Sequence, residues 1–517
     1  MKKILVLLSV ICIISSTISC GSTKSKEYTS NTFEEVLNAP EKSQTRTESD
    51  EVRKNVSIIT QDDDQSIEIV PGTIFDTNLI PLVYSEFTDQ SNFIRKISPE
   101  YSECFSNILS EFSCGLDSQP KYREALLTQN PTSKGEHLSG QSVITTYNAK
   151  IQKSVYEYCS ELNINGSVVI MRTDGSIAGE ISVPGYDANE YLETLIKGEE
   201  YPLVNDGNMR NKAEEKRAPG SAFKMISASI AKLEGIKGDT GETGVFNDEG
   251  FWDTSDGFRV KDWYYSDEVG FSSGYGPTVR NIRNAFILSS NVVFAKVFVS
   301  LGTSRIDSLT KKYFCFGVPI DLDFTTINYS NQLGLNSDKE LALTGFGQGK
   351  CSTTPLYLTM LTREVIYGSM VKATTLHKLC DTFFPERVLS KGSSTPCEVI
   401  ADTRGVTLKE EMHEIANGLD FSLEGYTLYC KTGTAEVEGN DDTLYIAAYL
   451  EADRNFSPSD IYENYRDYGD RNGSYFIVLQ IRNPKEIKFN WKDPNNIYAS
   501  HMGPILNNIA YLITSND

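Results

Sequence analysis

The chain has 517 residues, which is long enough for two to four domains, and its composition of 39% hydrophobic and 23% charged residues is typical of a folded globular protein. The formal net charge of −21 argues against a nucleic-acid-binding protein, because such proteins carry a basic surface that neutralises phosphates. The same charge offers no general attraction to an anionic membrane, so an anionic substrate must be held by a few placed cations.

The first twenty residues have the pattern of an export signal. Two lysines precede an apolar run, Ile4–Ile14, which is too short to span a bilayer, and small residues lead to Cys20. The segment 1–20 resembles a bacterial lipoprotein signal, which implies lipidation of Cys20 and a lipid anchor in the membrane, although Thr17 stands where leucine is typical. Ordinary cleavage and an uncleaved anchor that runs to about Ile18 are the alternatives. Each of them places the body of the protein outside the cytoplasm.

A flexible tether and a small module are predicted next. Residues 21–65 are rich in Ser, Thr, Lys, Glu, Asp and Gln and lack the apolar residues that a core needs. Such a tether has a reach of roughly 35–40 Å. Alternating apolar positions and a Pro-Gly turn predict a strand pair or bent strand over 66–85, and short helices are expected over 102–112 and 120–130. Together these elements form a predicted N-terminal module, 66–139.

The remaining residues, 140–517, are predicted to form one larger domain. Residues 140–162 begin as a strand and continue as a helix, and 165–182 form a hairpin that turns at Asp174-Gly175. The stretch 219–420 is expected to be largely helical. Strands at 426–437, 443–452 and 475–482 and a helix at 503–514 follow. We therefore predict an α/β (α+β) fold, in which an antiparallel sheet built from both ends of the domain is flanked by helices and joined to a largely helical subdomain.

The cysteines and histidines do not have metal-site spacing. None of the ten cysteines forms a Cys-x-x-Cys pair, and the four histidines are scattered, so no metal or cofactor is predicted. Proximity in the sequence favours the disulfides Cys104–Cys114 and Cys380–Cys397, which an exported protein can form.

Ser-x-x-Lys recurs in the chain, and three of its matches, at 221–224, 229–232 and 308–311, lie in stretches with a helical pattern. Pro219-Gly220 should interrupt the chain, so that a helix begins at Ser221. Ser221 and Lys224 would then share one helix face, and the free Ser221 N–H at the positive end of the helix could bind an oxyanion. This context makes Ser221 the candidate nucleophile.

The other two matches have simpler interpretations. Ser229 lies two turns further along a small and apolar helical pattern and is rotated by about 80° from Ser221, which indicates a packing residue. Ser308 lies beside Asp307 and two lysines, as on a solvated helix face.

A serine beside an ordinary lysine is inert, because a free lysine titrates near pH 10.4. Burial and a second cation can lower that pKa, so a second lysine aimed at the same place is expected. "CKTGTAEV" supplies Lys431, on a predicted strand. Gly433 would let a substrate backbone lie along this strand, and Thr432 and Thr434 share a face from which they could hold a carboxylate with Lys431. A strand that simply runs into a Thr-Gly turn is the alternative.

Ser289-Ser290-Asn291 separates two apolar helical stretches. These polar residues could cap the second helix. The alternative is that Ser289 passes a proton and Asn291 holds a substrate amide.

These motifs resemble those of the penicillin-recognising serine acyltransferases: Ser-x-x-Lys, Ser-x-Asn and Lys-Thr-Gly stand in that family's order. Further segments are similar to signatures of a penicillin-binding protein transpeptidase domain, namely "GQSVITTYNAKIQ", "GSVVIMRTDGSIAGEISVPGYDANEY", "PLVN", "RAPGSAFKM", "FGQGKCSTTPLYLTML" and "KTGTAE". The resemblance covers about 140–515, and a weaker one to the N-terminal module of class B-type members covers 71–130. Since no room for a glycosyltransferase domain exists before residue 140, the resemblance implies a monofunctional enzyme.

Two residues depart from the family's pattern. Pro71 stands where arginine is usual, and Tyr147 stands where aspartate is usual. Both are remote in sequence from the three motifs, so the departures bear on the packing between domains more than on the chemistry.

The resemblance also implies roles for individual residues. Ser221 attacks the D-Ala-D-Ala carbonyl of a peptidoglycan stem peptide and Lys224 takes its proton. Ser289 and Lys431 pass a proton to the leaving D-Ala, and Asn291 orients the stem amide and Lys224. The amides of Ser221 and Thr434 form the oxyanion hole. Lys431, Thr432 and Thr434 hold the terminal carboxylate, beside Gly433.

The implied partners are peptidoglycan stem peptides, β-lactam antibiotics, the membrane through the N-terminal anchor, and other cell-wall synthesis proteins; no nucleic acid is expected. Three alternatives stay open: a D,D-carboxypeptidase, a β-lactamase of the same fold, and a penicillin-binding sensor or scaffold with weak catalysis.

Overall fold

We describe the protein from a computed structural model. The structure describes residues 69–87, 93–109, 120–134, 138–199, 209–323, 326–327, 333–391, 398–436, 442–453, 473–494 and 496–517. The predicted signal 1–20 with Cys20 and the predicted tether 21–65 lie outside these residues. Within the described ranges, no helix combines the length and the apolar character that crossing a bilayer requires.

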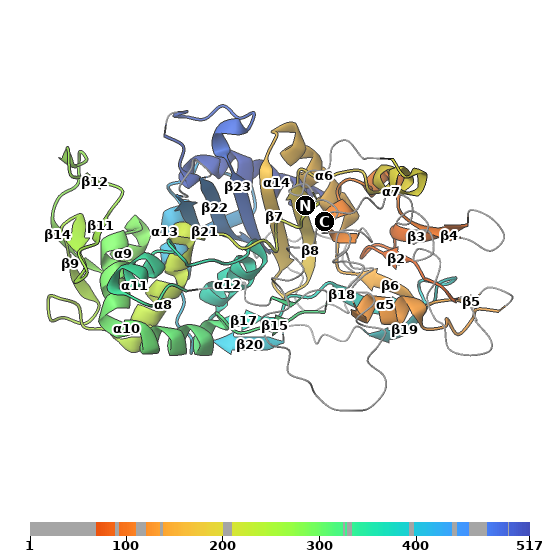
Figure 1. Ribbon diagram of the computed structural model, residues 1–517, viewed down its shortest axis with the longest axis horizontal. Coiled ribbons are helices and arrows are strands. Elements are labelled where there is room, and N and C mark those ends of the chain that lie inside the picture. The colour runs from red at the N-terminus through yellow and green to blue at the C-terminus, as the bar shows by residue number, and fades with distance from the viewer. Residues whose placement is uncertain are drawn as a thin grey trace, which may run out of the picture.

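A five-stranded antiparallel sheet forms the centre of the molecule (Figure 1). Its order is β21-β22-β23-β7-β8, so strands from the end of the chain pair with a hairpin from its beginning. The strands are β7 (Asn165–Arg172), β8 (Ile177–Val183), β21 (Tyr426–Ala435), β22 (Thr443–Ala452) and β23 (Tyr475–Arg482). The prediction of a sheet assembled from both ends is therefore confirmed.

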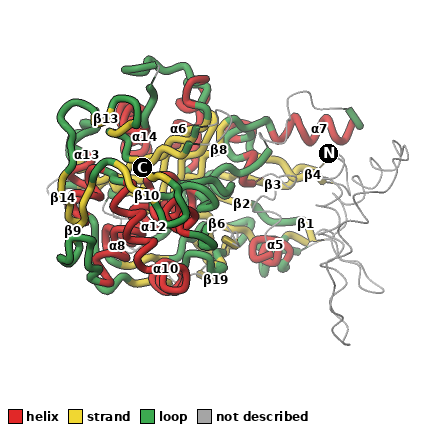
Figure 2. Tube along the Cα trace, turned by 60° about the vertical axis from the view of Figure 1, so that its left-hand side comes forward, coloured by secondary structure: helices red, strands yellow, loops and turns green. Residues whose placement is uncertain are grey.

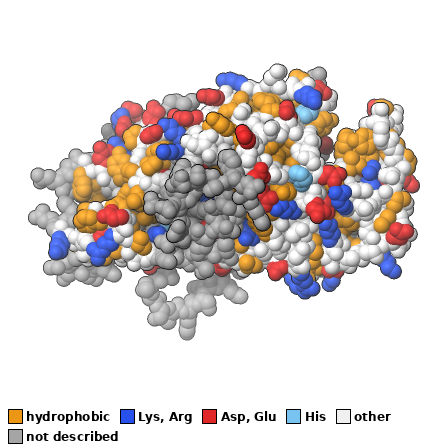
Figure 3. Space-filling model, turned by 180° about the vertical axis from the view of Figure 1, so that it is seen from behind, with side chains coloured by type: hydrophobic (Ala, Val, Ile, Leu, Met, Phe, Trp, Pro, Cys, Tyr) orange, Lys and Arg blue, Asp and Glu red, His pale blue; other side chains and the backbone are white. Residues whose placement is uncertain are grey.

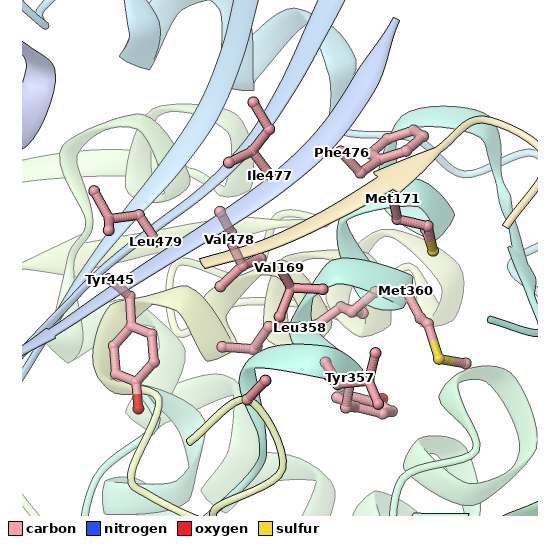
Figure 4. Packing of buried hydrophobic residues seen from close by; sticks show 14 of the residues in the cluster. Val169, Met171, Tyr357, Leu358, Met360, Tyr445, Phe476, Ile477, Val478 and Leu479 are labelled. Atoms are coloured by element: carbon pink, nitrogen blue, oxygen red, sulfur yellow. The ribbon is translucent and has the colours of Figure 1, made fainter. Parts of the chain in front are cut away.

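Helices cover both faces of this sheet. Figure 4 shows α12 (Pro355–Tyr367) packed under the face that carries Val169 and Val478. The other face, to which Ile170 belongs, is covered by α6 (Ala149–Glu161) and α14 (Gly503–Asn516). Since both faces are dry, every residue of β23 is buried, and this is why its sequence is an almost unbroken apolar run.

A helical subdomain lies against the edge of the sheet at β21. It contains η3 (Gly220–Phe223), a 3₁₀ turn that continues into α8 (Lys224–Glu234), together with α9 (Ile282–Leu288), α10 (Asn291–Phe314), α11 (Asp338–Gly345) and α13 (Lys409–Ala416). Figure 1 shows these helices grouped at the end of the molecule opposite to the N-terminal strands.

The prediction that 219–420 is largely helical is wrong for two stretches. The first holds β9 (Val245–Asp248), β10 (Phe251–Asp253), β11 (Arg259–Lys261), β12 (Tyr265–Ser266), β13 (Gly270–Phe271) and β14 (Thr278–Asn281). The second holds β15 (Ile320–Asp321), β16 (Thr326–Ile327), β17 (Ser369–Val371), β18 (Leu376–Cys380), β19 (Val388–Lys391) and β20 (Val399–Asp402). These strands have at most five residues, which is too short for a period of two to stand out in the sequence.

The N-terminal module shares a sheet with the larger domain. The order β19-β18-β6-β2-β3-β4 joins β2 (Ile74–Phe75), β3 (Pro81–Phe87) and β4 (Phe93–Ile97) to β6 (Ser142–Thr145), and β2 pairs with β6 in parallel. The boundary expected at residue 140 therefore runs through a continuous sheet. Figure 2 shows β3, β4 and α7 extending away from the body that contains α8, α10 and α12.

The remaining elements of the fold are short. They are β1 (Ile69–Val70), β5 (Leu138–Ser139), η1 (Pro99–Tyr101), α4 (Ser106–Leu109), α5 (Pro120–Leu127), α7 (Ala188–Lys197), η5 (Pro484–Glu486) and η6 (Ala499–Met502). The helices α4 and α5 fall within the two short helices expected from the sequence.

The two unusual residues find partners in this region. The backbone oxygen of Pro71 accepts a hydrogen bond from the Arg95 guanidinium at 3.3 Å. The Tyr147 hydroxyl donates to the buried carboxyl of Glu180 at 3.0 Å. The Tyr147 side chain is thus held by a contact with the large sheet, whereas the Pro71 contact uses a backbone atom that any residue at this position would supply.

Within the described residues, the surface in Figure 3 has no patch of a single charge, and the two cysteines considered below are free thiols. On the described part of the face in Figure 3, basic and acidic side chains are interspersed rather than gathered by sign. The thiols of Cys104 and Cys380 are free, which contradicts the two expected disulfides, and their expected partners lie outside the described residues.

Candidate active site

Ser221 lies in a 3₁₀ turn and not at the start of an α-helix. The turn begins one residue earlier than predicted, at Gly220, whose φ of +54° suits glycine. In a 3₁₀ helix, side chains three residues apart eclipse each other. Ser221 and Lys224 are three apart, and their Oγ and Nζ atoms lie 2.9 Å from each other. Ser221 is half-buried, whereas Lys224 is fully buried.

Three glycines allow this turn to sit between β21 and the loop after α11. A Cβ at Gly220 would lie 2.3 Å from the backbone oxygen of Thr434, and one at Gly347 would lie 2.0 Å from the backbone oxygen of Gly220. A Cβ at Gly433 would lie 2.7 Å from the backbone oxygen of Pro219. The Gly220 N–H also donates to the Gly347 oxygen at 2.9 Å.

This packing corrects the role expected for Gly433. From the sequence, this glycine is expected to leave room for a substrate backbone along the strand. In the structure, the space beside its Cα is occupied by the turn that carries Ser221, so the glycine lets this turn approach the strand. Thr432 and Thr434 point away from the buried side of β21 and are half-buried.

The corner between α9 and α10 contains Ser289, Ser290 and Asn291. Ser289 ends α9 in a left-handed conformation, with φ of +61°, which is uncommon for a residue other than glycine. Ser290 caps α10, because its Oγ accepts the Val293 N–H at 3.1 Å. The capping interpretation therefore applies to Ser290, and it leaves Ser289 and Asn291 on either side free to face Lys224.

Lys224 is surrounded by oxygens of this corner. Its Nζ lies 2.6 Å from the Ser289 backbone oxygen and 2.7 Å from Asn291 Oδ1. The amide of Asn291 is oriented by its other end, where Nδ2 donates to the Lys261 oxygen at 2.8 Å. Because carbonyl and amide oxygens only accept, both N–H groups of a neutral Lys224 amine are used there. The lone pair is left for the Ser221 hydroxyl.

Lys431 reaches the same place from β21. Its Nζ donates to Ser289 Oγ at 3.1 Å and to the Thr432 backbone oxygen at 2.9 Å. The Ser289 Oγ is also 3.2 Å from Lys224 Nζ. The two lysines, which are more than 200 positions apart in the sequence, thus meet at one hydroxyl.

Burial lowers the pKa of both amines, and the charge of Lys431 lowers that of Lys224 further. Desolvation comes first, followed by the charge of Lys431, and together they hold the pKa of Lys224 well below its usual range. Burial lowers the pKa of Lys431 to about 8. This arrangement favours the neutral form of Lys224 much more than water does, beside a Lys431 whose pKa stays above neutrality.

The edge of β21 offers a second feature near Ser221. The Thr434 backbone oxygen accepts from Gln348 Nε2 at 3.3 Å, so it faces away from β22. In an antiparallel strand the N–H and C=O of one residue point to the same side, which places the Thr434 N–H on this outer edge as well. The Ser221 N–H lies in the first turn of its helix, where no preceding helical carbonyl is available.

The Ser-x-x-Lys matches at 229–232 and 308–311 lack these surroundings. Ser229 is fully buried and its Oγ has no hydrogen-bond partner within the described part of the chain, while Lys232 pairs with Glu411 at 2.6 Å. Lys311 pairs with Asp307 at 2.8 Å on an exposed helix face. The interpretations of Ser229 as a packing residue and of 308–311 as a solvated face are confirmed.

Sequence reasoning missed two contributors to this site. Gln348 lies in the family-like segment "FGQGKCSTTPLYLTML", but nothing in the sequence indicates its contact with Thr434. Asp262, which accepts a hydrogen bond from the Asn291 backbone N–H, was not singled out, because it lies 29 positions before Asn291 in a segment of very short strands. Within the described residues, no group of three or more His, Cys, Asp or Glu side chains could hold a metal ion.

Sequence relatives match most of the larger domain. The model of the family described as "Penicillin binding protein transpeptidase domain" matches residues 166–459. Penicillin-binding protein 3 of Bacillus subtilis is 26% identical over 364 residues, which cover 66% of this chain and 50% of that protein. Peptidoglycan D,D-transpeptidase MrdA of Haemophilus influenzae is 24% identical over 325 residues, covering 58% and 47%. The chain therefore spans about half the length of the curated relatives it matches.

Solved structures share the fold. The D,D-transpeptidase domain of a peptidoglycan glycosyltransferase from Eggerthella lenta superposes with a TM-score of 0.64 at 18% identity, covering 86% of this chain and 98% of that one. Penicillin-binding protein A of Mycobacterium tuberculosis, solved as an imipenem acyl-enzyme complex, gives 0.65 at 17% identity, covering 86% and 99%. Since the family match contains all three motifs and more than half of the residues, the chain belongs to the penicillin-binding protein transpeptidase domain family.

Proposed function

We propose that this protein is a peptidoglycan D,D-transpeptidase that cross-links stem peptides through an acyl-enzyme on Ser221 and is inhibited by β-lactams. The observation that carries the proposal is the convergence of Lys224 and Lys431 on Ser289 Oγ, with Ser221 Oγ 2.9 Å from Lys224. A serine needs a base, and a lysine becomes one only where its pKa is lowered, as it is here.

In the acylation step, Ser221 Oγ forms a bond to the penultimate D-Ala carbonyl carbon while its proton moves to Lys224. The carbonyl becomes an oxyanion, which the N–H groups of Ser221 and Thr434 stabilise. The bond from this carbon to the terminal D-Ala nitrogen then breaks. That nitrogen needs a proton, and Ser289, within 3.2 Å of both lysine Nζ atoms, is placed to pass one to it.

The outer edge of β21 supports substrate binding. It is the last strand of its sheet, so an extended stem peptide can lie along it as an added strand. Thr432 and Thr434 present half-buried hydroxyls, and Lys431 keeps the positive charge that attracts the terminal carboxylate. Asn291 orients the stem amide, and Gly433 contributes by letting the serine turn approach this edge.

Transfer completes the cycle. An amine from a neighbouring stem attacks the acyl carbon, its proton passes to Lys224, and Ser221 leaves with a proton restored. A β-lactam follows the first step only, because the ring nitrogen stays tethered to the acyl group after the ring opens. No step needs a metal or cofactor.

We also propose the location and partners that the N-terminal sequence supports. Residues 1–20 would direct export, Cys20 would be lipidated, and 21–65 would tether residues 66–139 and the transpeptidase domain, 140–517, outside the cytoplasm. There the enzyme would meet peptidoglycan and other cell-wall synthesis proteins.

Mass spectrometry of the protein with benzylpenicillin tests the assignment of Ser221. We expect a stable adduct on the peptide that contains Ser221, lost in Ser221→Ala and kept in Ser229→Ala, which is the matched control on the same helix. An adduct elsewhere, or none in the folded protein, contradicts the proposal.

Turnover decides between related activities. A stem-peptide analogue supplied with an amine acceptor should give the acyl-amine product in excess of the hydrolysed one. Release of D-Ala with water as the only acceptor indicates a carboxypeptidase, and repeated hydrolysis of penicillin indicates a β-lactamase. An adduct without activity on the analogue indicates a sensor or scaffold.

A further inference from the structure

Two buried carboxylates lie behind the corner that carries Ser289 and Asn291. Asp262 Oδ1 accepts the backbone N–H of Asn291 and, at 3.2 Å, that of Val292, which are the first two residues of α10. Asp262 Oδ2 accepts the Ser290 hydroxyl at 3.1 Å. One carboxylate therefore caps α10 together with Ser290 and fixes the backbone from which Asn291 projects.

The second carboxylate belongs to Asp248, on β9. Its Oδ2 accepts a hydrogen bond from Arg280 Nε at 2.6 Å and lies 2.7 Å from the Tyr264 hydroxyl oxygen and 3.2 Å from Ser290 Oγ. Tyr264 also reaches Asp262 Oδ2 at 2.7 Å, so its hydroxyl joins the two carboxylates. Arg280 offsets the charge of Asp248, whereas no basic side chain among the described residues forms an ion pair with Asp262.

We propose, on the basis of the function proposed above, that Asp262 is a positioning residue for acylation, which holds Asn291 Oδ1 against Lys224 and sets the charge state of that amine. The chain of contacts is short. Asp262 binds the Asn291 backbone, the Asn291 side chain binds Lys224 Nζ at 2.7 Å, and Lys224 faces Ser221.

Electrostatics support both parts of this role. The groups that face Asp262 are Asp248 from β9, Tyr264 two residues further along the chain, and Lys224 from α8, while Arg280 from β14 pairs with Asp248. Burial, followed by the charge of Asp248, raises the pKa of Asp262 to about 7. The negative charge of Asp262 in turn raises the pKa of Lys224 and opposes the lowering by burial and by Lys431. Lys224 thus sits between one cation and one anion with opposite effects on its proton.

Two substitutions separate position from charge. Asp262→Asn keeps an oxygen for the N–H groups of Asn291 and Val292 but removes the negative charge. Asp262→Ala removes both. Asp253→Asn is the matched control, because Asp253 is an exposed carboxylate of the same segment that pairs with Arg259. The measurement is the second-order rate constant of acylation by a fluorescent penicillin between pH 5 and pH 9, with a thermal melt to check folding.

We expect Asp262→Asn to keep the maximal rate within about threefold. Because Asp262 carries its charge mainly above about pH 7, the substitution should favour neutral Lys224 there and move that part of the rising limb to lower pH by roughly half a unit. Asp262→Ala should lower the maximal rate by about 10- to 100-fold, because Asn291 loses its anchor. Asp253→Asn should match the wild-type protein in rate and profile.

Two results overturn the inference: a rising limb of Asp262→Asn that is unchanged above about pH 7, or a folded Asp262→Ala protein whose maximal rate is within about twofold of wild type. If Asp262→Ala does not fold, Tyr264→Phe replaces it, and an unaltered rate in that variant also counts against the inference. Failure of the proposed function is distinguishable, since the wild-type protein itself would then form no adduct on Ser221.

Discussion

Two Ser-x-x-Lys matches lie eight residues apart on one helical segment and differ in everything that surrounds them. At 221–224, the serine is half-buried and its lysine is enclosed by oxygens of the Ser289–Asn291 corner. At 229–232, the serine is sealed in the core and its lysine reaches Glu411 on another helix. The spacing is identical, so the chemistry comes from the segments that pack around each pair.

The difference lies mainly in which charge each lysine meets. Lys224 meets the cation Lys431 in a dry environment, and its pKa falls. Lys232 meets a carboxylate at 2.6 Å and is partly exposed. A neutral amine is favoured in the first place, and an ammonium ion pair is favoured in the second.

Replacing each lysine with methionine should give the largest difference between the two Ser-x-x-Lys pairs. Lys224→Met removes the base and should lower the acylation rate by about a thousandfold or more. Lys232→Met should leave that rate within about threefold but lower the free energy of unfolding by about 1–3 kcal/mol, because Glu411 loses its partner while nearly buried. Acylation by a fluorescent penicillin and chemical denaturation measure the two effects. Equal loss of acylation in both variants would show that the two matches are not distinct.

Lys431→Met tests whether the charge of Lys431 lowers the pKa of Lys224. In the wild-type protein, acylation should rise with pH as Lys224 loses its proton and fall again near pH 8, where Lys431 loses its charge. Without Lys431, the pKa of Lys224 rises, so the rising limb should move to higher pH and the falling limb should disappear. The maximal rate should drop by about 10- to 100-fold, because Ser289 loses one of its two proton partners.

The control for this variant is Lys311→Met, which removes an exposed lysine paired with Asp307. Its pH profile should match that of the wild-type protein. A falling limb near pH 8 that persists in Lys431→Met would mean that another group causes it.

The sequence was sufficient for the central sheet and the three motifs, since both rest on local patterns. The strands β7 and β23 contain apolar runs, at 168–171 and 475–479, and Pro219-Gly220 marks a chain break beside Ser221. The short strands β9–β14 could not be predicted, because a strand of two to four residues has no period to detect. Asp262 was missed for the same reason: its partners lie on another element, and only the fold brings them together.

Gly433 shows a subtler limit. From the sequence, the missing side chain at Gly433 was expected to make room for a substrate. The sequence does not show which neighbouring residues occupy the space beside this glycine. The structure identifies the serine turn, at Pro219 and Ala222.

Gly433→Ala should therefore disturb the first Ser-x-x-Lys pair without touching either of its residues. The added Cβ would lie 2.7 Å from the Pro219 oxygen and 2.9 Å from the Ala222 nitrogen, so the turn must shift. We expect about a tenfold slower acylation and a loss of about 1–3 kcal/mol in the free energy of unfolding. Gly276→Ala is the control, since a Cβ there meets nothing within 4 Å. Equal acylation rates in the two variants would refute the packing role of Gly433.

Ser229→Ala should have the smallest effect, and its sign is informative. The Ser229 hydroxyl is fully buried and has no hydrogen-bond partner within the described part of the chain, so it carries a desolvation cost that nothing offsets. Alanine also has the higher helix propensity. The variant should therefore acylate at the wild-type rate and gain about 0.5–1 kcal/mol in the free energy of unfolding, measured by denaturant titration. A loss of stability of similar size would mean that this hydroxyl does form a hydrogen bond, and the contrast with Ser221 would then rest on the lysines alone.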